Sequence, residues 1–287
     1  MSTESLAAEI GRLAAATVRE LATAGGGHGA RHYRARLADG RDLFVKQDDE
    51  AKLSAEASGL RWLAQAATVP LPTVLFLHNT VLGMDWIREA GPERASAERF
   101  GRDLAALHAA GADRFGAPWR GFIASLPLPN TRADSWPSWY AQHRLLPYCA
   151  MGRDAGLLGP ADVVLVESVA SRVAEIAGPS GDEPPSRIHG DCWSGNVLWS
   201  GGRGWLIDPA AHGGHRETDL AMLALFGAPH LDAILGSYAE AAPLADGWRA
   251  RAALHQLHPL LVHVCLFGSA YLDGVRSAAR AALRASP

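Results

Sequence analysis

The chain has 287 residues, 48% of them hydrophobic and 20% charged, which is enough apolar material for the core of one large domain or two small ones. Its 27 basic and 30 acidic residues give a formal net charge of −3, so there is no electrostatic reason to expect nucleic acid or an anionic membrane as a partner. The three cysteines lie far apart and form no CxxC pair, which excludes the usual signatures of a disulfide framework or a zinc site.

The two ends of the chain carry no targeting or membrane signal. The first residues are acidic and amphipathic, unlike a signal peptide. The apolar stretch 257–272 is interrupted by His258, Pro259 and His263 and is too short to cross a bilayer. We therefore expect a cytoplasmic protein without a membrane partner. The pattern does not indicate the oligomeric state, and a monomer is favoured.

The first third of the chain has a mixed pattern. Apolar residues from Leu6 to Leu21 recur at helical spacing, which predicts a helix that ends at the glycines 25–27. Strands are predicted over 32–37 and 42–46, joined by a hairpin at Asp39-Gly40, and over 74–78 and 81–87. A helix over 51–67 separates these two pairs of strands. The pattern indicates a small sheet with a helix against it.

From residue 96 onward the pattern becomes mainly helical. Helices are predicted over 96–110, 136–148 and 161–177, with a loop over 179–185, and helical patterns fill most of the chain after 208. Two short strands, 196–199 and 204–208, flank a second hairpin. We predict an α+β, bilobal architecture: residues 1–87 form an amino-terminal antiparallel-sheet lobe that binds nucleotide, and residues 88–287 form a larger helical lobe with the catalytic loop. The hinge is expected at about 85–92.

Three oxygen-bearing side chains occur in the order that phosphoryl transfer requires. Asp191 is followed by Asn196 five residues later and by Asp208 at the end of the second hairpin. A kinase needs a carboxylate that accepts the proton of the attacking hydroxyl, and hard oxygen ligands that hold Mg²⁺ against the phosphates of ATP. We predict Asp191 as the base and Asn196 and Asp208 as metal ligands. Each residue alone would be read as a turn or cap residue.

Lysine occurs at only two positions, Lys46 and Lys52, in a chain that otherwise uses arginine for its positive charge. Lys46 ends an apolar strand, where a kinase places the lysine that contacts the α- and β-phosphates. Its expected partner is Glu56 on the following helix, with Glu50 and Asp49 as alternatives.

Two further segments are candidates for nucleotide binding. Gly26 and Gly27 lie one hairpin before Lys46, where bare backbone amides could approach phosphates, although a glycine cluster is also typical of a flexible loop. The strand end Met84-Asp85-Trp86-Ile87 leads into the linker, where adenine would meet backbone groups; an ordinary buried strand fits this pattern equally well.

With these residues in place, the chain resembles the fructosamine kinase (ketosamine kinase) family, within the wider aminoglycoside phosphotransferase and choline kinase group. The resemblance rests on His189-Gly190-Asp191-Cys192-Trp193-Ser194-Gly195-Asn196, on 207–210 and on 214–222, and extends over most of the chain. It implies ATP-dependent phosphorylation of the 3-hydroxyl of a ketoamine, the adduct of a reducing sugar and an amine, and therefore deglycation.

The acceptor is expected to be a small molecule rather than a polypeptide, because only ten residues separate Asp208 from Asp219; the resemblance implies that it is a sugar-amine. Trp193 could lie against a sugar ring, although core packing is an even alternative. His215, Arg216 and Glu217 are predicted to line the acceptor pocket, as is His263, for which a buried structural role is the alternative.

Three other functions remain as alternatives. A kinase for an aminoglycoside, choline or homoserine is the nearest. A pseudokinase that binds nucleotide without turnover is disfavoured, because Lys46, Asp191, Asn196 and Asp208 are all present. A metal-dependent hydrolase is disfavoured because no HExxH motif occurs.

Overall fold

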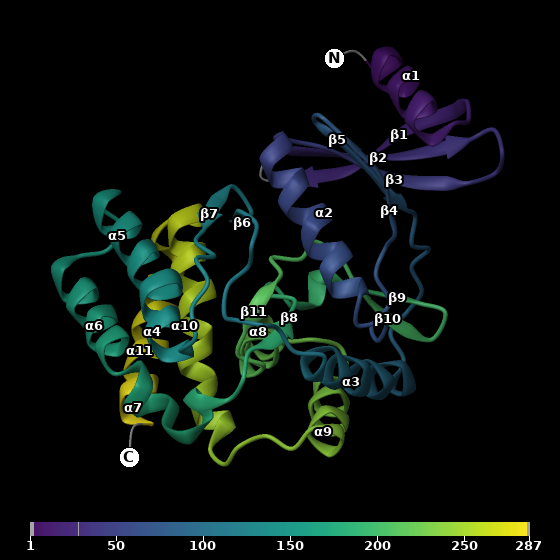
Figure 1. The fold of residues 1–287 in the computed structure, drawn as a ribbon. Coiled ribbons are helices and arrows are strands. Elements are labelled where there is room, and N and C mark those ends of the chain that lie inside the picture. Colours follow the sequence, from purple (N-terminus) through teal and green to yellow (C-terminus); the bar gives the residue numbers. More distant parts are fainter. Residues whose placement is uncertain (1–2, 28, 286–287) are drawn as a thin grey trace.

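The computed structural model describes residues 3–27 and 29–285. Within this part of the chain, a five-stranded antiparallel sheet has the strand order β1-β2-β3-β5-β4. Its strands and the two helices that pack on it are α1 (Thr3–Ala14), β1 (Val18–Gly27), β2 (Ala30–Leu37), β3 (Asp42–Gln47), α2 (Glu50–Ala64), β4 (Val74–His78) and β5 (Val81–Asp85). In Figure 1 this sheet lies at the top, and α2 descends from it toward the helices of the rest of the chain.

The remaining elements are mainly helical, as predicted, and three short two-stranded sheets lie among them. In chain order they are α3 (Arg94–Ala109), β6 (Gly121–Ile123), β7 (Leu126–Leu128), α4 (Trp136–Tyr140), the π-helix η1 (Ala141–Leu145), α5 (Leu146–Asp154), α6 (Pro160–Ser171), α7 (Val173–Ala177), the 3₁₀ turn η2 (Gly178–Asp182), β8 (Ser186–Ile188), the 3₁₀ turn η3 (Ser194–Asn196), β9 (Val197–Ser200), β10 (Arg203–Leu206), β11 (His212–Gly214), α8 (Glu217–Phe226), α9 (Leu231–Ala241), α10 (Trp248–Phe267), the 3₁₀ turn η4 (Ser269–Tyr271) and α11 (Leu272–Arg284).

One helix packs on each face of the sheet. Successive side chains of β3 point to opposite faces, so the two helices contact different residues of this strand. Leu43 and Val45 pack in the cluster that contains α1, whereas Phe44 packs in the cluster under α2. Because successive side chains of a strand point to opposite faces, Lys46 lies on the same face as Phe44. The strand therefore directs its terminal lysine toward α2.

The prediction of a helix up to the glycines 25–27 was wrong. The helix ends at Ala14, Ala15 adopts a positive φ of 53°, and β1 begins at Val18. Leu21 fits the helical spacing but lies opposite Ala35 of β2. The β-branched pair Thr17-Val18 favours an extended backbone, and pairing with β2 over the length of β1 outweighs the weak helical signal.

The glycines that are candidates for phosphate binding belong to the β1–β2 hairpin. Gly26 lies opposite Arg31 and Gly27 lies opposite Ala30, while His28 lies outside the described residues. Gly26 has a φ of +152°, and a Cβ there would lie 2.6 Å from the carbonyl oxygen of Ala30. The hairpin therefore requires glycine at this position for its own geometry.

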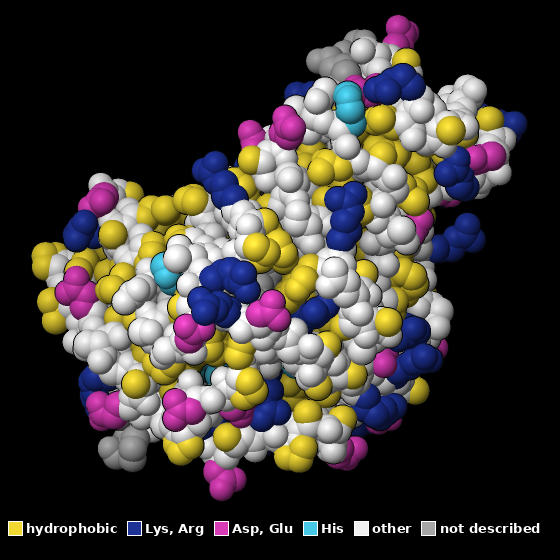
Figure 2. Space-filling model, in the orientation of Figure 1, with side chains coloured by type: hydrophobic (Ala, Val, Ile, Leu, Met, Phe, Trp, Pro, Cys, Tyr) yellow, Lys and Arg dark blue, Asp and Glu magenta, His cyan; other side chains and the backbone are white. Residues whose placement is uncertain are grey.

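Figure 2 shows acidic and basic side chains interspersed over the visible face. No helix within residues 3–27 and 29–285 is long and apolar enough to span a bilayer.

The helices α3 and α9 and the β9–β10 hairpin share a core that supports the catalytic segment. Phe100 of α3 is fully buried, lies edge-on to Trp199 of β9, and approaches Gly204 of β10 so closely that a Cβ there would clash with the ring. Replacing Phe100 with alanine should lower the free energy of unfolding by about 3–5 kcal/mol, because a large buried ring is lost and a cavity remains.

Chemical denaturation of the Phe100→Ala variant would measure this loss. Val164→Ala is the control, because Val164 is 62% exposed and its truncation should change stability little. Equal effects of the two substitutions would contradict this description of the core.

Candidate active site

A cavity of about 690 Å³ opens between the sheet and the helices, a size typical of small-ligand sites. Its wall includes four residues that the sequence predicted for catalysis: Lys46, Asp191, Asn196 and Asp208. They come from β3, from the loop after β8, from η3 and from the loop after β10. Residues that are far apart in the chain are thus brought to one site.

Lys46 occupies the centre of a buried charged group. It is 7% exposed, and its Nζ lies 2.9 Å from both carboxylate oxygens of Glu56 and also contacts Asp208. The pairing with Glu56 that the sequence favoured over Glu50 and Asp49 is present. Burial acts to lower the pKa of Lys46, but the two carboxylates outweigh it and hold this pKa above its usual value.

The two carboxylates of this group differ in their environment. Burial raises the pKa of Glu56 and outweighs the nearby ammonium. Burial also opposes ionisation of Asp208, yet contact with Lys46 outweighs it and lowers the pKa of that carboxyl. One ammonium therefore faces two carboxylates, and the excess of negative charge favours a further cation beside Asp208.

Asp191 is held by the loop that contains it. The Nδ2 atom of Asn196 donates to both the carbonyl oxygen and the Oδ2 atom of Asp191, each at 2.9 Å. Burial raises the pKa of Asp191 to about 7, with the charges of Asp208 and Asp219 adding to it and the bond from Asn196 opposing it. A carboxyl with this pKa is suited to accept a proton near neutral pH.

The loop around Asp191 is fixed by the buried carboxylate of Asp219. It accepts the backbone N–H of His189 at 2.7 Å and that of Gly190 at 2.9 Å. Gly190 has a φ of +81°, and a Cβ there would lie 2.3 Å from the carbonyl oxygen of Ala210. Only glycine fits this approach, so Asp219 and Gly190 together set the path of the catalytic loop.

His189 connects the same loop to the second hairpin. Its Nε2 lies 2.9 Å from the carbonyl oxygen of Ile207, so this nitrogen carries the proton, and its Nδ1 accepts the N–H of Asp191 at 3.3 Å. One imidazole thus links the loop of Asp191 to the residue before Asp208. These hydrogen bonds bring Asp191, Asn196 and Asp208, which are separated in the sequence, close together in the fold.

The donor set at Asn196 and Asp208 fits magnesium. The amide nitrogen of Asn196 is used by Asp191, which leaves its Oδ1 as an oxygen donor, and Asp208 supplies a carboxylate. Hard oxygen ligands near an excess of negative charge are what Mg²⁺ prefers.

One part of the cavity wall is mainly apolar and aromatic. On α8, Thr218, Met222 and Phe226 face it at intervals of one helical turn. Trp193 is 38% exposed, contacts the Phe226 ring edge-on at 6.3 Å and lies on the wall, as does His263. Both residues are therefore placed where the sequence predicted them.

Three residues predicted for the acceptor pocket, His215, Arg216 and Glu217, do not line this cavity, and their prediction was wrong. His215 and Glu217 are 2% and 1% exposed. Arg216 pairs with Glu183 through two hydrogen bonds of 2.7 and 2.8 Å. These side chains precede or begin α8 and point into the helical core, whereas Thr218, the next residue, faces the cavity.

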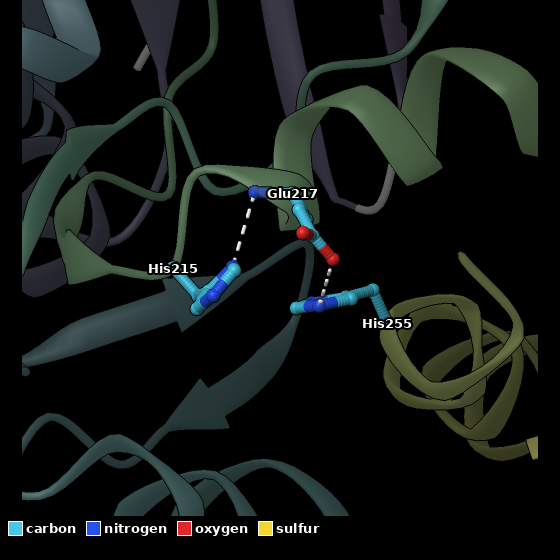
Figure 3. Close-up of side chains that lie close together, drawn as sticks. All are labelled: His215, Glu217 and His255. Carbon is cyan, nitrogen blue, oxygen red and sulfur yellow. Dashed lines mark hydrogen bonds and ion pairs between the residues drawn. The ribbon is translucent and has the colours of Figure 1, made fainter. Parts of the chain in front are cut away.

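Figure 3 shows His215 and Glu217 together with His255 from α10. Their possible ligand atoms lie within 4.8 Å of one another, which is close enough to hold a metal ion. The ligand atoms of His215 and Glu217 are already used, however. Arg251 donates to both oxygens of Glu217, at 3.0 and 2.6 Å. His215 uses both nitrogens, one toward the carbonyl oxygen of Ser180 and one toward the N–H of Glu217. His255 bonds the Thr218 hydroxyl through Nδ1, while its buried Nε2, 3.5 Å from Glu217, forms no hydrogen bond in the described residues. With most of its ligand atoms bonded within the protein, the cluster is a structural network.

The predicted linker residues also lie away from the cavity wall. The side chain of Met84 is buried against α2, and Asp85 accepts the N–H of Thr73. Trp86 lies beneath the guanidinium of Arg34, and neither it nor Ile87 lines the cavity. Gly26 lines the cavity.

Several wall residues were not predicted from the sequence, among them His32, Asp48, Lys52, Phe122 and His258. Lys52 could have been found from the scarcity of lysine in the sequence, since the two lysines of the chain both line this cavity. The others reach the wall through long-range packing, for which no short motif exists.

The buried pair of Arg251 and Glu217 generates a stability prediction. Arg251→Met should lower the free energy of unfolding by about 3–5 kcal/mol, because it leaves a buried carboxylate without its partner. Thermal or chemical denaturation would measure the loss. The double variant Arg251→Met/Glu217→Gln should recover part of it, and a double variant less stable than the single one would contradict a shared pair.

The same pair predicts a dependence of stability on pH. Burial acts to raise the pKa of Glu217, but the neighbouring His255 and Arg251 outweigh it and lower this pKa to about 2 from a usual value of 4.5. A carboxylate with a lowered pKa stabilises the fold above pH 4.5, and this contribution is lost as the pH falls toward 2. The stability difference between the native chain and Glu217→Gln should therefore shrink below pH 4.5; a constant difference would contradict the pairing.

Comparisons with known proteins agree with this geometry. The family model described as fructosamine kinase matches residues 3–285. A protein named as a probable ketoamine kinase from Synechocystis sp. is 31% identical over 259 residues, which cover 86% of this chain and 85% of that protein.

Solved structures extend the likeness to the fold. A protein from Thermobifida fusca assigned as a fructosamine-3-kinase superposes with a TM-score of 0.94 at 51% identity, covering 99% of this chain and 100% of the other. The ADP-bound aminoglycoside phosphotransferase APH(2'')-Ib superposes with a TM-score of 0.67 at 15% identity, covering 100% of this chain and 98% of the other, and shows the shared kinase-like fold. The α+β, bilobal fold expected from the sequence is confirmed.

Proposed function

This chain belongs to the fructosamine kinase family, and from that premise we propose how its residues transfer phosphate from ATP to the 3-hydroxyl of a ketoamine. That the chain is an ATP-dependent ketoamine kinase follows from the family and from its curated relatives. The observation that carries the mechanism is the convergence of Lys46, Asp191, Asn196 and Asp208 on one cavity with an aromatic wall.

Asp191 acts as the catalytic base in this proposal. The oxygen of the sugar hydroxyl forms a bond with the γ-phosphorus, the bond from that phosphorus to the oxygen bridging to the β-phosphate breaks, and ADP leaves with the electron pair. The hydroxyl proton passes to the carboxylate of Asp191. Asn196 orients that carboxylate through its Nδ2 atom, which fixes the oxygen that receives the proton.

Lys46 and the metal ligands stabilise the phosphates. Lys46, oriented by Glu56, would contact the α- and β-phosphates. Asn196 Oδ1 and the Asp208 carboxylate would hold Mg²⁺, which when bound neutralises the charge that develops on the phosphates. The loop bonds of Asp219 and His189 keep both ligands near Asp191 before any substrate arrives.

The acceptor side supports a sugar rather than a polycation. Trp193 and Phe226 offer aromatic faces suited to the C–H edges of a sugar ring. The carboxylates on the wall, Asp48, Glu56, Asp191 and Asp208, include three that belong to the proposed catalytic group, and Asp48 already pairs with Lys52 at 3.2 Å. The wall thus lacks the separate acidic surface that an aminoglycoside would favour.

Some expectations stay predictions. These are the boundary at residues 85–92 between an amino-terminal lobe of 1–87 and a carboxy-terminal lobe of 88–287, and the contact of adenine with the backbone of residues 84–87. The monomeric state and the cytoplasmic location are also untested.

A turnover assay across acceptors would test the proposed function. ADP release should be stimulated by ketoamines of glucose, ribose or erythrose, and not by choline or an aminoglycoside. Asp191→Asn should lower turnover by about 10²–10⁴-fold, because an amide cannot accept the proton, while ADP affinity measured by calorimetry should stay near that of the native chain.

Asp113→Asn is the matched control, since this carboxylate is 95% exposed and lies outside the cavity. An Asp191→Asn variant with full turnover would remove Asp191 from the mechanism. Stimulation by the aminoglycoside or choline alone would replace the proposed acceptor.

A further inference from the structure

His258 lies on the cavity wall but takes no part in the mechanism proposed above. It is 6% exposed, lines the same cavity as Asp191, and directly precedes Pro259 in the middle of α10. Of the other α10 residues that line the cavity, Val262, Leu266 and Phe267 are apolar, and His263 is the second polar ring. A polar ring that is buried in such a wall is expected to form hydrogen bonds.

The protonation of the ring is fixed by its one hydrogen bond within the described chain. The Nδ1 atom of His258 lies 3.0 Å from the carbonyl oxygen of Arg144. A carbonyl can only accept, so Nδ1 carries the proton and Nε2 of the neutral ring bears a lone pair. Burial, with the nearby Arg144 adding to it, lowers the pKa of His258 to about 3, which keeps the ring neutral at ordinary pH.

The Nε2 atom of His258 therefore offers an unused acceptor. No hydrogen bond to it occurs in residues 3–27 and 29–285, although the ring lies on the cavity wall. An acceptor on a largely buried wall gains a partner only from a molecule that enters the cavity. The structure thus presents a fixed, uncharged acceptor to the ligand.

The side chain of Arg144 fixes the backbone segment to which His258 is hydrogen-bonded. The guanidinium is 1% exposed, lies 4.2 Å from the centre of the Trp139 ring, and donates to the carbonyl oxygens of Pro129 and His143 and to Oδ1 of Asn130. Pro147 has no N–H for the carbonyl of His143, and the guanidinium supplies that bond. The backbone that binds His258 is therefore rigid.

Helix α10 is tied to the same region at its proline. Pro259 cannot donate to the carbonyl of His255 four residues earlier, and the hydroxyl of Tyr140 donates to that oxygen at 3.2 Å. The carbonyl that Pro259 leaves without a backbone donor is thus bonded by a side chain of α4. Both partners in the His258–Arg144 bond are held by separate contacts.

The charge of Arg144 selects between the possible donors on a ketoamine. The substrate carries neutral hydroxyls and an amine that is cationic when protonated. Arg144 forms no ion pair with a carboxylate in the described residues, so its positive charge disfavours a second cation at His258. A neutral hydroxyl can donate to Nε2 without this repulsion.

We propose that His258 is a specificity-determining residue whose Nε2 accepts a hydrogen bond from a sugar hydroxyl other than the one that is phosphorylated. The inference rests on the proposed function and extends it, because it assigns recognition of the sugar to a residue outside the catalytic group. A sugar that lacks this hydroxyl leaves a desolvated acceptor unpaired, which is a strong basis for rejection.

Fluorinated substrates would test this assignment. Fluorine replaces a hydroxyl with little change in size but cannot donate a hydrogen bond. With the native chain, kcat/KM for a fructose-derived ketoamine should fall by about tenfold to hundredfold when the hydroxyl at one of positions 4, 5 or 6 is replaced by fluorine. With His258→Phe, the unmodified substrate should show a similar loss, and the same fluorine should cause no further loss.

Two other variants make the result specific. His258→Gln retains an acceptor oxygen near the position of Nε2 and should restore part of the discrimination against the fluorinated substrate. His143→Phe is the matched control, because this histidine neighbours Arg144 but does not line the cavity, and it should behave as the native chain. Thermal denaturation with and without ADP would establish that each variant is folded.

The outcomes separate the inference from the proposed function. Equal discrimination by the native chain and His258→Phe would overturn the role of His258, as would a native chain indifferent to fluorine at all three positions. Discrimination that depends on His258 but follows methylation of the amine nitrogen would overturn the assignment to a hydroxyl. A native chain inert toward every unmodified ketoamine would remove the proposed function itself, and the inference with it.

Discussion

The ammonium of Lys46, held between Glu56 and Asp208, is the contact on which the site depends. It joins three parts of the fold: a strand of the sheet, the helix α2 that packs on it, and the loop after β10 that carries Asp208, the proposed metal ligand. A buried charge of this kind is costly unless it is paired, so the two halves of the molecule gain a strong preference for the arrangement in which the cavity forms. Catalytic geometry and folding are coupled through this one group.

The proposed catalytic residues could be picked out in the sequence because their relative positions are set locally. Asp191, Asn196 and Asp208 belong to one loop and hairpin, in which a short bond network converts spacing into proximity. Lys46 could be assigned because the alternation of β3 fixes the face it occupies, and because lysine is rare in this chain. Neither inference needs the rest of the fold.

Other parts of the structure depend on distant pairing, and the sequence gives little signal for them. The start of β1 was mistaken for helix, because only the presence of β2 favours a strand there. The short strand β8 pairs with β11, more than twenty residues away, and was not predicted. His215 and Glu217 were predicted to line the cavity, but both are buried in the core. Thr218, the residue after Glu217, lines the cavity instead. The role of His258 follows from Arg144, which no motif connects to it.

The scarcity of lysine has a consequence beyond catalysis. Reducing sugars condense with primary amines, and the ε-amino group of lysine is the usual protein site of that reaction. Here Lys46 and Lys52 have side chains only 8% and 22% exposed, and every other basic side chain apart from histidine is a guanidinium. In a cell rich in sugar, a kinase that acts on such adducts thus presents few lysine amines on which they could accumulate.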